Sequence, residues 1–221
     1  MMIDSSDRKG MNAFDGRSEI AGRDRIRRSV SRPLAPGADT VARLRVTHPF
    51  VCRGAVSPAA CDGGEMVIRW WGGDREALRG LFREADDSEA EVDRYLGSGD
   101  VLVAEDNGLV VGHLQVVDGD GAVELKSMAV LAERRGTGVG RALVEAAVEH
   151  CRRGGASRMV VSTAAADVGN LRFYQRQGFR MLRVERDAFT SASGYPDGIV
   201  IDGIPLRDRI WLDRELVADQ S

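Results

Sequence analysis

A glycine-rich run between an apolar segment and an amphipathic segment constrains this chain more than any other feature. The run follows the strand-like segment 123–130 and opens the helix-like segment 138–153, whose small apolar residues recur at helical spacing. Alternating glycines let a backbone turn tightly and present several N–H groups to one concavity. With the positive end of the following helix, they predict a site for a pyrophosphate. The run is Arg134-Arg135-Gly136-Thr137-Gly138-Val139-Gly140-Arg141.

Two rival nucleotide motifs do not fit this run. A dinucleotide-binding G-x-G-x-x-G pattern that starts at Gly136 would need glycine in place of Arg141, and one that starts at Gly138 would need glycine in place of Leu143. A P-loop would end in Gly-Lys-Ser or Gly-Lys-Thr, which the run lacks. A glycine-rich turn without any ligand stays open as the alternative.

The remaining pattern from residue 66 onward predicts a mixed α/β domain that is antiparallel in its first part. Its order differs from the regular βαβ alternation of a Rossmann domain. The predicted strands are 66–71, 101–105, 109–117, 123–130, 158–163, a strand beginning at 178–179, and a final hairpin of 199–201 with 206–212. The predicted helices run through 77–82, 89–96, 138–153 and 170–177.

Residues 1–64 differ in composition from the rest and are predicted to be a disordered extension before a domain of residues 65–221. They are rich in Ser, Gly, Arg and Asp and lack helical or strand periodicity. They hold 11 Lys and Arg against 7 Asp and Glu, a charge of +4, so the −3 of the whole chain leaves −7 for the remainder. A mildly acidic domain offers no footprint for nucleic acid. A partner for the basic cluster Arg23–Arg32, an over-long gene start and a homodimer all stay open.

The sequence also bears on compartment and metals. No apolar run reaches the roughly 18 residues that span a bilayer, and the start lacks the apolar region of a secretory signal. We therefore expect a cytoplasmic protein without a membrane partner. The three cysteines, Cys52, Cys61 and Cys151, have neither zinc nor thioredoxin spacing, so no metal site or disulfide framework is predicted.

Two motifs together resemble those of the GNAT superfamily of N-acetyltransferases. Arg135-Gly-Thr-Gly138-Val-Gly140 matches its R/Q-x-x-G-x-G/A signature, directly after a strand that ends at Val130. Asn170-Leu-Arg-Phe-Tyr174-Gln-Arg-Gln-Gly178-Phe179 resembles its Asn-x-x-x-Tyr…Gly-Phe helix-to-strand segment. The resemblance covers about residues 66–216 and implies a mixed, mostly antiparallel sheet that is flanked by helices and contains one splayed strand pair.

The resemblance further implies acetyl-CoA as co-substrate, with its pantetheine arm between strands 123–130 and 158–163. The arm would contact the first strand, and the pyrophosphate would contact the glycine-rich loop, with Asn170 facing the cofactor. The implied cofactor-binding residues are Met128, Ala129, Val130, Arg135, Gly136, Thr137, Gly138, Val139, Gly140, Arg141 and Asn170.

Two residues are candidates for proton transfer. An ammonium group has no lone pair, so attack on a thioester requires a base. Glu124 lies at a spacing similar to that of the general-base glutamate in the histone-acetyltransferase branch, although Lys126 on the same strand face could pair with it. By resemblance Tyr174 faces the sulfur, where its phenol can donate a proton to the departing thiolate. A solvated carboxylate and a packed aromatic ring are the respective alternatives.

The predicted function is therefore N-acetyl transfer from acetyl-CoA to a primary amine of a small molecule or protein. A non-enzymatic acyl-CoA-binding regulatory module is the alternative, and an interaction protein that works through its basic extension is a third reading. Segment 185–208 is expected to shape the acceptor site. The acceptor, the acyl-chain preference and the oligomeric state are not readable from the sequence.

Overall fold

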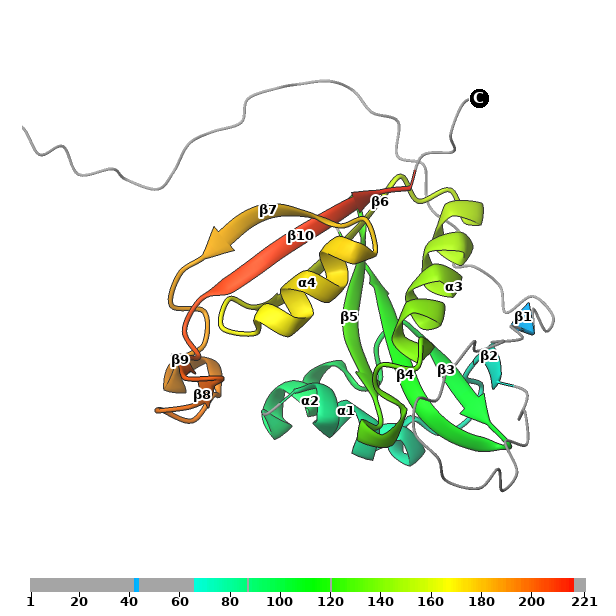
Figure 1. Cartoon of the computed structure of the whole chain (residues 1–221), viewed down its shortest axis with the longest axis horizontal. Coiled ribbons are helices and arrows are strands. Elements are labelled where there is room, and N and C mark those ends of the chain that lie inside the picture. Colours follow the sequence, from blue (N-terminus) through cyan, green and yellow to red (C-terminus); the bar gives the residue numbers. More distant parts are fainter. Residues whose placement is uncertain (1–41, 44–65, 87, 120, 217–221) are drawn as a thin grey trace, which may run out of the picture. The chain divides into compact units, whose positions relative to one another are not determined.

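The computed structural model describes residues 42–43, 66–86, 88–119 and 121–216 (Figure 1). Its strands are β1 Ala42–Arg43, β2 Met66–Trp70, β3 Asp100–Asp106, β4 Leu109–Asp118, β5 Val123–Val130, β6 Arg158–Ala164, β7 Arg180–Glu185, β8 Val200–Ile201, β9 Ile204–Pro205 and β10 Arg209–Glu215. Its α-helices are α1 Arg79–Ala85, α2 Glu89–Tyr95, α3 Val139–Arg153 and α4 Val168–Arg176. Short 3-10 helices span Arg75–Leu78, Ala132–Arg134 and Ser191–Ser193.

In the described part of the chain, eight strands form one sheet in the order β1-β2-β3-β4-β5-β6-β10-β7. Every neighbouring pair is antiparallel except β5 and β6, which run parallel. The predicted mixed, mostly antiparallel sheet is confirmed. The parallel pair arises because α3 carries the chain back across the sheet between β5 and β6, the crossover that two parallel strands require.

The two faces of the sheet carry separate apolar clusters, and β3 contributes to both. Leu102 and Ala104 belong to the cluster that packs under α3, whereas Val101 and Val103 belong to the cluster under α1 and α2. This alternation follows from the period of two along a strand. Helices therefore cover both faces of the β3–β5 region, and Figure 1 shows α3 and the α1–α2 pair around these strands.

Local capping and turn chemistry agree with the predicted element boundaries. Asp74 accepts from the Glu76 N–H at the start of the first 3-10 helix, and Ser88 accepts from the Glu91 N–H at the start of α2. The β3–β4 turn places Asn107 at φ 52° and Gly108 at φ 81°. These left-handed values fit an Asn-Gly hairpin turn.

The predicted final hairpin is wrong in its pairing. Residues 199–201 were expected to pair along 206–212, but β8 pairs only with the short β9, and the tight turn at Asp202 and Gly203 closes this hairpin. β10 instead inserts between β6 and β7 and pairs with both. The reason is burial: Ile210 and Leu212 alternate along β10 and join the main core, which a surface hairpin could not provide.

Most of the predicted N-terminal extension, including the basic cluster Arg23–Arg32, lies outside the described residues, as do Cys52 and Cys61. The described pair Ala42–Arg43 forms β1 beside β2, at the edge of the sheet. Within the described part of the chain, no helix combines the length and the apolar character that crossing a bilayer demands.

Candidate active site

A cleft begins where β5 and β6 stop pairing. The two strands are in register only at Val123 with Met159, Glu124 with Val160 and Leu125 with Val161, yet both continue beyond these positions. A bulge coincides with the separation: Val116 of β4 faces Leu125, the next residue Gln115 faces Ser127, and Lys126 is left as the extra residue. Because a bulge bends its strand, it turns β5 away from β6 directly after their last pair.

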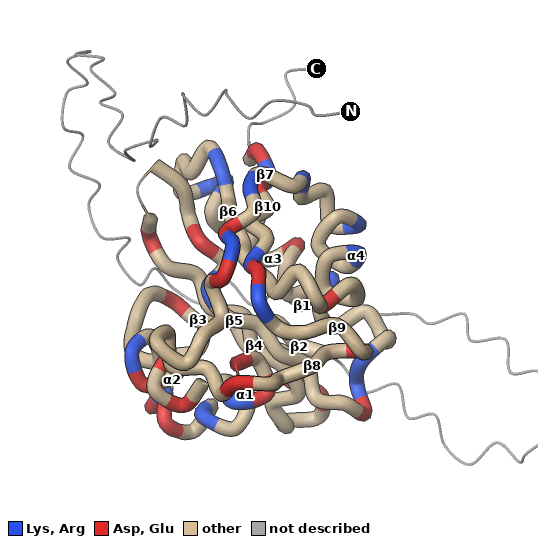
Figure 2. Tube along the Cα trace, turned by 90° about the vertical axis from the view of Figure 1, so that its left-hand side faces the viewer, with Lys and Arg blue, Asp and Glu red and all other residues tan. Residues whose placement is uncertain are grey.

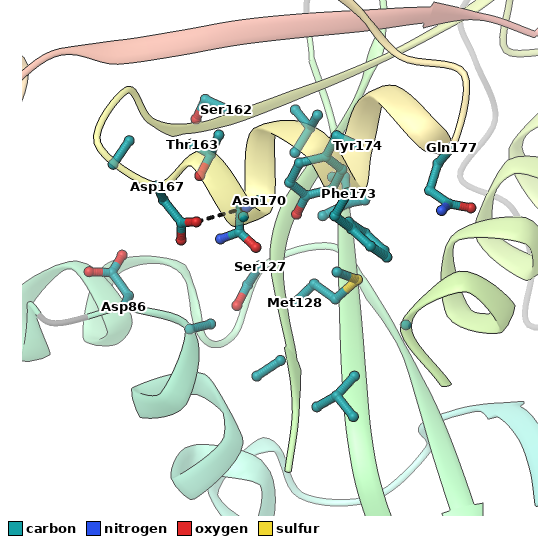
Figure 3. Close-up of a pocket in the computed structure, with 18 of the residues that line it drawn as sticks. Asp86, Ser127, Met128, Ser162, Thr163, Asp167, Asn170, Phe173, Tyr174 and Gln177 are labelled. Atoms are coloured by element: carbon teal, nitrogen blue, oxygen red, sulfur yellow. Dashed lines mark hydrogen bonds between the residues drawn. The ribbon is translucent and has the colours of Figure 1, made fainter. Parts of the chain in front are cut away.

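The cleft has a volume of about 1290 Å³. That exceeds the roughly 300–1,000 Å³ of an ordinary small-ligand pocket and leaves room for two reactants. Its walls come from β5, β6, the first turn of α3, α4, the end of α1, α2 and the segment between β7 and β10. Figure 3 shows Met128 of β5 facing Phe173 and Tyr174 of α4 across this space.

The separated part of β5 offers unpaired backbone groups to the cleft. The Leu131 N–H donates to the Val111 carbonyl of β4 at 2.9 Å. In an antiparallel ladder the groups that face one neighbour alternate, so the N–H and C=O of Met128 and Val130 point away from β4 and toward the cleft. The Val130 carbonyl already accepts from Arg135 Nε at 3.0 Å. Both groups of Met128 and the N–H of Val130 can therefore bind an extended polar ligand.

The glycine-rich loop leads into a second set of free donors. Gly136 and Gly138 adopt φ values of 75° and 95°, which favour glycine. The first helical bond at this end of α3 runs from the Ala142 N–H to the Gly138 carbonyl at 3.0 Å. The N–H groups of residues 139–141 precede it and have no partner within the helix. Together with the helix dipole, these N–H groups are suited to an anion.

The arginine side chains around this loop are held by carboxylates. Arg134 pairs with Asp106 at 2.5 Å, Arg135 with Glu84 at 3.1 Å, and Arg141 with Glu145 at 2.7 Å. They contribute positive potential, but their donors are partly occupied. The backbone N–H groups are therefore the better-prepared partners for a pyrophosphate.

Most of the predicted site residues line the cleft, and three do not. Thr137 donates from Oγ1 to the Arg134 carbonyl at 2.6 Å. Val139 buries its side chain in the main core. Glu124 lies on the paired part of β5 and contacts Lys126 at 3.4 Å. The residues that do line the cleft are Met128, Ala129, Val130, Arg135, Gly136, Gly138, Gly140, Arg141, Asn170 and Tyr174.

The surroundings of Tyr174 keep its phenol protonated. Its side chain is only 6% exposed, and its ring packs edge-on against Phe173 and Phe179. Burial raises the pKa of Tyr174 above its ordinary value. Among the described residues its hydroxyl has no hydrogen-bond partner within the protein, and Figure 3 shows it at the cleft beside Asn170 and Thr163. It can therefore donate a proton to a ligand atom.

The sequence did not single out a carboxylate and two phenols that meet in the same cleft. Asp86, the residue that follows α1, accepts from Tyr95 at 3.4 Å, from Tyr195 at 3.3 Å and from the Ser88 N–H at 2.9 Å. Burial raises the pKa of the Asp86 carboxyl. The one available signal was the expectation that segment 185–208, which contains Tyr195, shapes the acceptor site.

A buried hydrogen bond between β4 and β5 holds Ser127, one of the residues that line the cleft. His113 of β4 contacts the Ser127 hydroxyl through Nε2 at 3.0 Å and stacks on Phe82. Burial lowers the pKa of His113 to about 3, so the ring is neutral and positions Ser127 rather than titrating near neutrality. In the part of the chain that the structure describes, no three His, Cys, Asp or Glu side chains gather as metal ligands would.

Comparison with known proteins yields one family. A sequence model of the acetyltransferase (GNAT) family matches residues 66–179. The uncharacterized N-acetyltransferase YvbK of Bacillus subtilis is 30% identical over 141 residues, which cover 62% of this chain and 90% of that protein. A GNAT acetyltransferase of Elizabethkingia anophelis, solved with acetyl-CoA bound, is 26% identical with a TM-score of 0.62 and covers 68% of this chain and 97% of its own. A Bacillus subtilis acetyltransferase in complex with CoA is 28% identical with a TM-score of 0.63 and covers 68% and 98%.

Proposed function

The chain belongs to the GNAT family of acetyltransferases and uses acetyl-CoA, and we propose that it acetylates a primary amine of a small molecule or a protein by direct attack on the thioester. One observation carries this proposal. The unpaired backbone of Met128 and Val130, the free N–H groups of the α3 first turn and the Tyr174 hydroxyl all border one cleft. These groups suit, in turn, an amide-bearing arm, a pyrophosphate and a leaving sulfur.

The residues of the cleft fit a bound acetyl-CoA. When bound, it supplies an acyl group activated as a thioester. The Met128 backbone would orient the pantetheine arm, and the loop from Arg135 to Arg141 would bind the pyrophosphate, with Asn170 alongside. The relatives that were solved with acetyl-CoA or CoA bound support the choice of this cofactor.

The chemistry requires one proton to leave the amine and one to reach the sulfur. The amine nitrogen forms a bond to the acyl carbon as the carbon–sulfur bond breaks. Tyr174 is proposed to deliver its phenolic proton to the sulfur, since its raised pKa keeps that proton in place at neutral pH. Bulk water can then reprotonate the phenolate through the open cleft.

The candidate base for the amine proton lies farther from the cleft lining than Tyr174 does. Glu124 stays a prediction for this role. Glu124 is not among the residues that line the cleft, and its carboxylate pairs with Lys126. It would therefore take the amine proton through a bridging water molecule. A carboxylate that acts through an ordered water is a recognised form of general base.

Release of free thiol from acetyl-CoA in the presence of candidate amines tests the proposed function. The panel should contain polyamines, aminoglycosides, amino acids and peptides with free N-termini, with thermal stabilisation by CoA as the prior check of binding. Amine-dependent thiol release with a matching acetylated product is expected. Stabilisation by CoA without turnover on any amine would instead favour the non-enzymatic acyl-CoA-binding module.

A further inference from the structure

We infer that Asp86, together with the hydroxyls of Tyr95 and Tyr195, binds the ammonium group of the acceptor and makes the enzyme selective for amines that are protonated in solution. The inference rests on the proposed acetylation of an amine. It adds the residue that recognises the acceptor and the charge that the acceptor must carry.

Asp86 differs from the other carboxylates that line the cleft. Among the described residues, its partners are the two phenols and the Ser88 N–H, all of them neutral, and no Lys, Arg or His lies within ion-pair distance. The other acidic lining residues are occupied: Glu84, Glu91 and Glu145 pair with Arg135, Arg94 and Arg141, and Asp167 caps α4. Asp86 and Asp167 are thus the two carboxylates of this cleft without a counter-ion among the described residues, and Asp86 is the one whose oxygens accept from two phenols.

The nearby cations are neutralised by carboxylates that do not line the cleft. Lys126 lies 3.4 Å from Glu124, and Arg209 lies 3.7 Å from Glu185. Figure 2 shows acidic and basic residues interspersed along α1 and α2. Lys126 Nζ lies over the Tyr95 ring, 5.6 Å from its centroid, so one cation stands at the side of the site. A cationic ligand that enters beside Asp86 still meets a carboxylate without an ion-pair partner among the described residues.

The two phenols prepare Asp86 to receive a cation. Burial raises the pKa of both Tyr95 and Tyr195, so their hydroxyls remain donors to the carboxylate at neutral pH. These bonds hold the carboxylate in place while leaving it charged, and half-burial strengthens its attraction to a cation. The Tyr195 ring, packed edge-on against Phe189, adds an aromatic surface of the kind that attracts ammonium groups and the carbon chains attached to them.

The site is assembled from segments that are far apart in the chain. Asp86 follows α1, Tyr95 ends α2, and Tyr195 lies in the segment between β7 and β10. All three line the same cleft as Met128 and Tyr174. Figure 3 shows Asp86 on the side of this space where Ser127 and Asn170 also lie. An amine bound at Asp86 therefore shares the cleft with the predicted position of the thioester.

The test compares Asp86→Asn with wild type on two matched ligands. The first is the amine that wild type acetylates best in the panel above, and the second is the alcohol in which a hydroxyl replaces the accepted amino group, measured as an inhibitor. Loss of a charged hydrogen-bond partner should raise KM for the amine at least about tenfold. The Ki of the uncharged alcohol and KM for acetyl-CoA should stay within about twofold of wild type.

Two further variants control the comparison. Asp197→Asn removes the same charge from an exposed position in the segment that carries Tyr195, and should leave all three constants unchanged. Asp86→Ser also removes the charge but has a side chain of a different shape. It replaces Asp86→Asn in the comparison if CoA no longer stabilises Asp86→Asn against thermal unfolding. Equal changes for amine and alcohol, or an unchanged KM for the amine, would overturn the inference while leaving the proposed function standing. Turnover by wild type on no amine would contradict the proposed function and, with it, this inference.

Discussion

The proposed proton transfer to sulfur depends on one hydroxyl, that of Tyr174. The family resemblance implied that it faces the cofactor sulfur, and the structure brings its ring to the cleft between two other aromatic rings. Packing fixes the ring, while the hydroxyl keeps its donor free for a ligand. Because burial raises its pKa, the phenol stays protonated at neutral pH, which is the form that a proton donor requires.

Replacing Tyr174 by Phe tests that role because it removes the hydroxyl and keeps the ring. We expect kcat to fall at least about tenfold, the lower part of the range for general acid catalysis. KM for acetyl-CoA should stay within about twofold, since the ring still fills its place. Steady-state rates, with single-turnover rates to show that chemistry limits kcat, give the measurement. An unchanged kcat under that condition would remove Tyr174 as the proton donor.

Asp86 allows a prediction about stability and pH. Its pKa is raised in the folded protein because burial penalises the charged form. The folded state therefore binds its proton more tightly than the unfolded chain, and stability falls as the pH rises through this range. Asp86→Asn abolishes the penalty and should raise Tm relative to wild type at neutral pH.

The gain should shrink as the pH falls through the raised folded-state pKa toward about 4, the ordinary value for an aspartate, and vanish below it, where both states are protonated. Thermal melts from pH 4 to pH 7 measure the difference in Tm between the two proteins. A difference that is constant across this range, or a lower Tm for the variant at neutral pH, would contradict the assignment. A gain in stability coupled to a loss of acceptor binding is typical of a functional carboxylate.

At the scale of elements, the loop before α3 is the part of the candidate site whose backbone conformation most requires glycine. Gly138 has φ 95° and open space around its missing side chain, so the cost of a side chain there is backbone strain rather than a clash. Strain would shift the N–H groups of residues 139–141 that face the predicted pyrophosphate.

Gly138→Ala is expected to raise Kd for CoA at least about fivefold, equivalent to about 1 kcal/mol. Gly108→Ala is the matched control, because Gly108 also has a positive φ of 81° and open surroundings but lies in the β3–β4 turn. Both variants should lose about 1 kcal/mol of stability from the left-handed backbone. Calorimetric titration with CoA separates the two, and equal CoA affinities in both variants would argue against a role for the loop.

The sequence predicted elements best where local chemistry determines them. The Asn107-Gly108 turn, the caps at Asp74 and Ser88 and the helical spacing of α3 all act within a few residues, and the elements beside them lie close to their predicted ranges. The pairing of β10 was missed because it depends on which distant strands have open edges. The departure of β5 from β6 was implied only by the family resemblance, since the bulge at Lys126 leaves no local signature.

At the scale of the whole molecule, the catalytic unit is predicted to need only residues 65–221. A chain that starts at residue 65 loses β1, which pairs with β2 at the sheet edge remote in strand order from β5 and β6. We expect kcat/KM for acetyl-CoA and the amine to stay within about twofold of the full chain. Parallel assays of the two proteins decide this, and a large loss of activity or folding in the shorter chain would show that residues 1–64 belong to the functional unit.

The proposed cofactor-binding and acceptor-binding parts of the candidate site differ in how far the sequence predicted them. The predicted cofactor-binding residues come from two contiguous motifs and the strand before the first of them, and most of these residues line the cleft. The proposed acceptor contacts join Asp86, Tyr95 and Tyr195, which only the tertiary fold brings together. Glu124 was chosen by spacing along a strand, and spacing alone cannot tell whether a side chain lies beside the paired or the separated part of that strand.

The central claim is that the separated strands β5 and β6 hold a thioester beside the free N–H groups of α3. A crystal structure of the chain with CoA tests it most directly. The account predicts the diphosphate against the backbone of residues 136–141, hydrogen bonds from the pantetheine arm to the Met128 backbone, and the CoA sulfur within hydrogen-bond reach of the Tyr174 hydroxyl. Ordered CoA bound elsewhere on the protein, with the space between Met128 and Tyr174 empty, would contradict it.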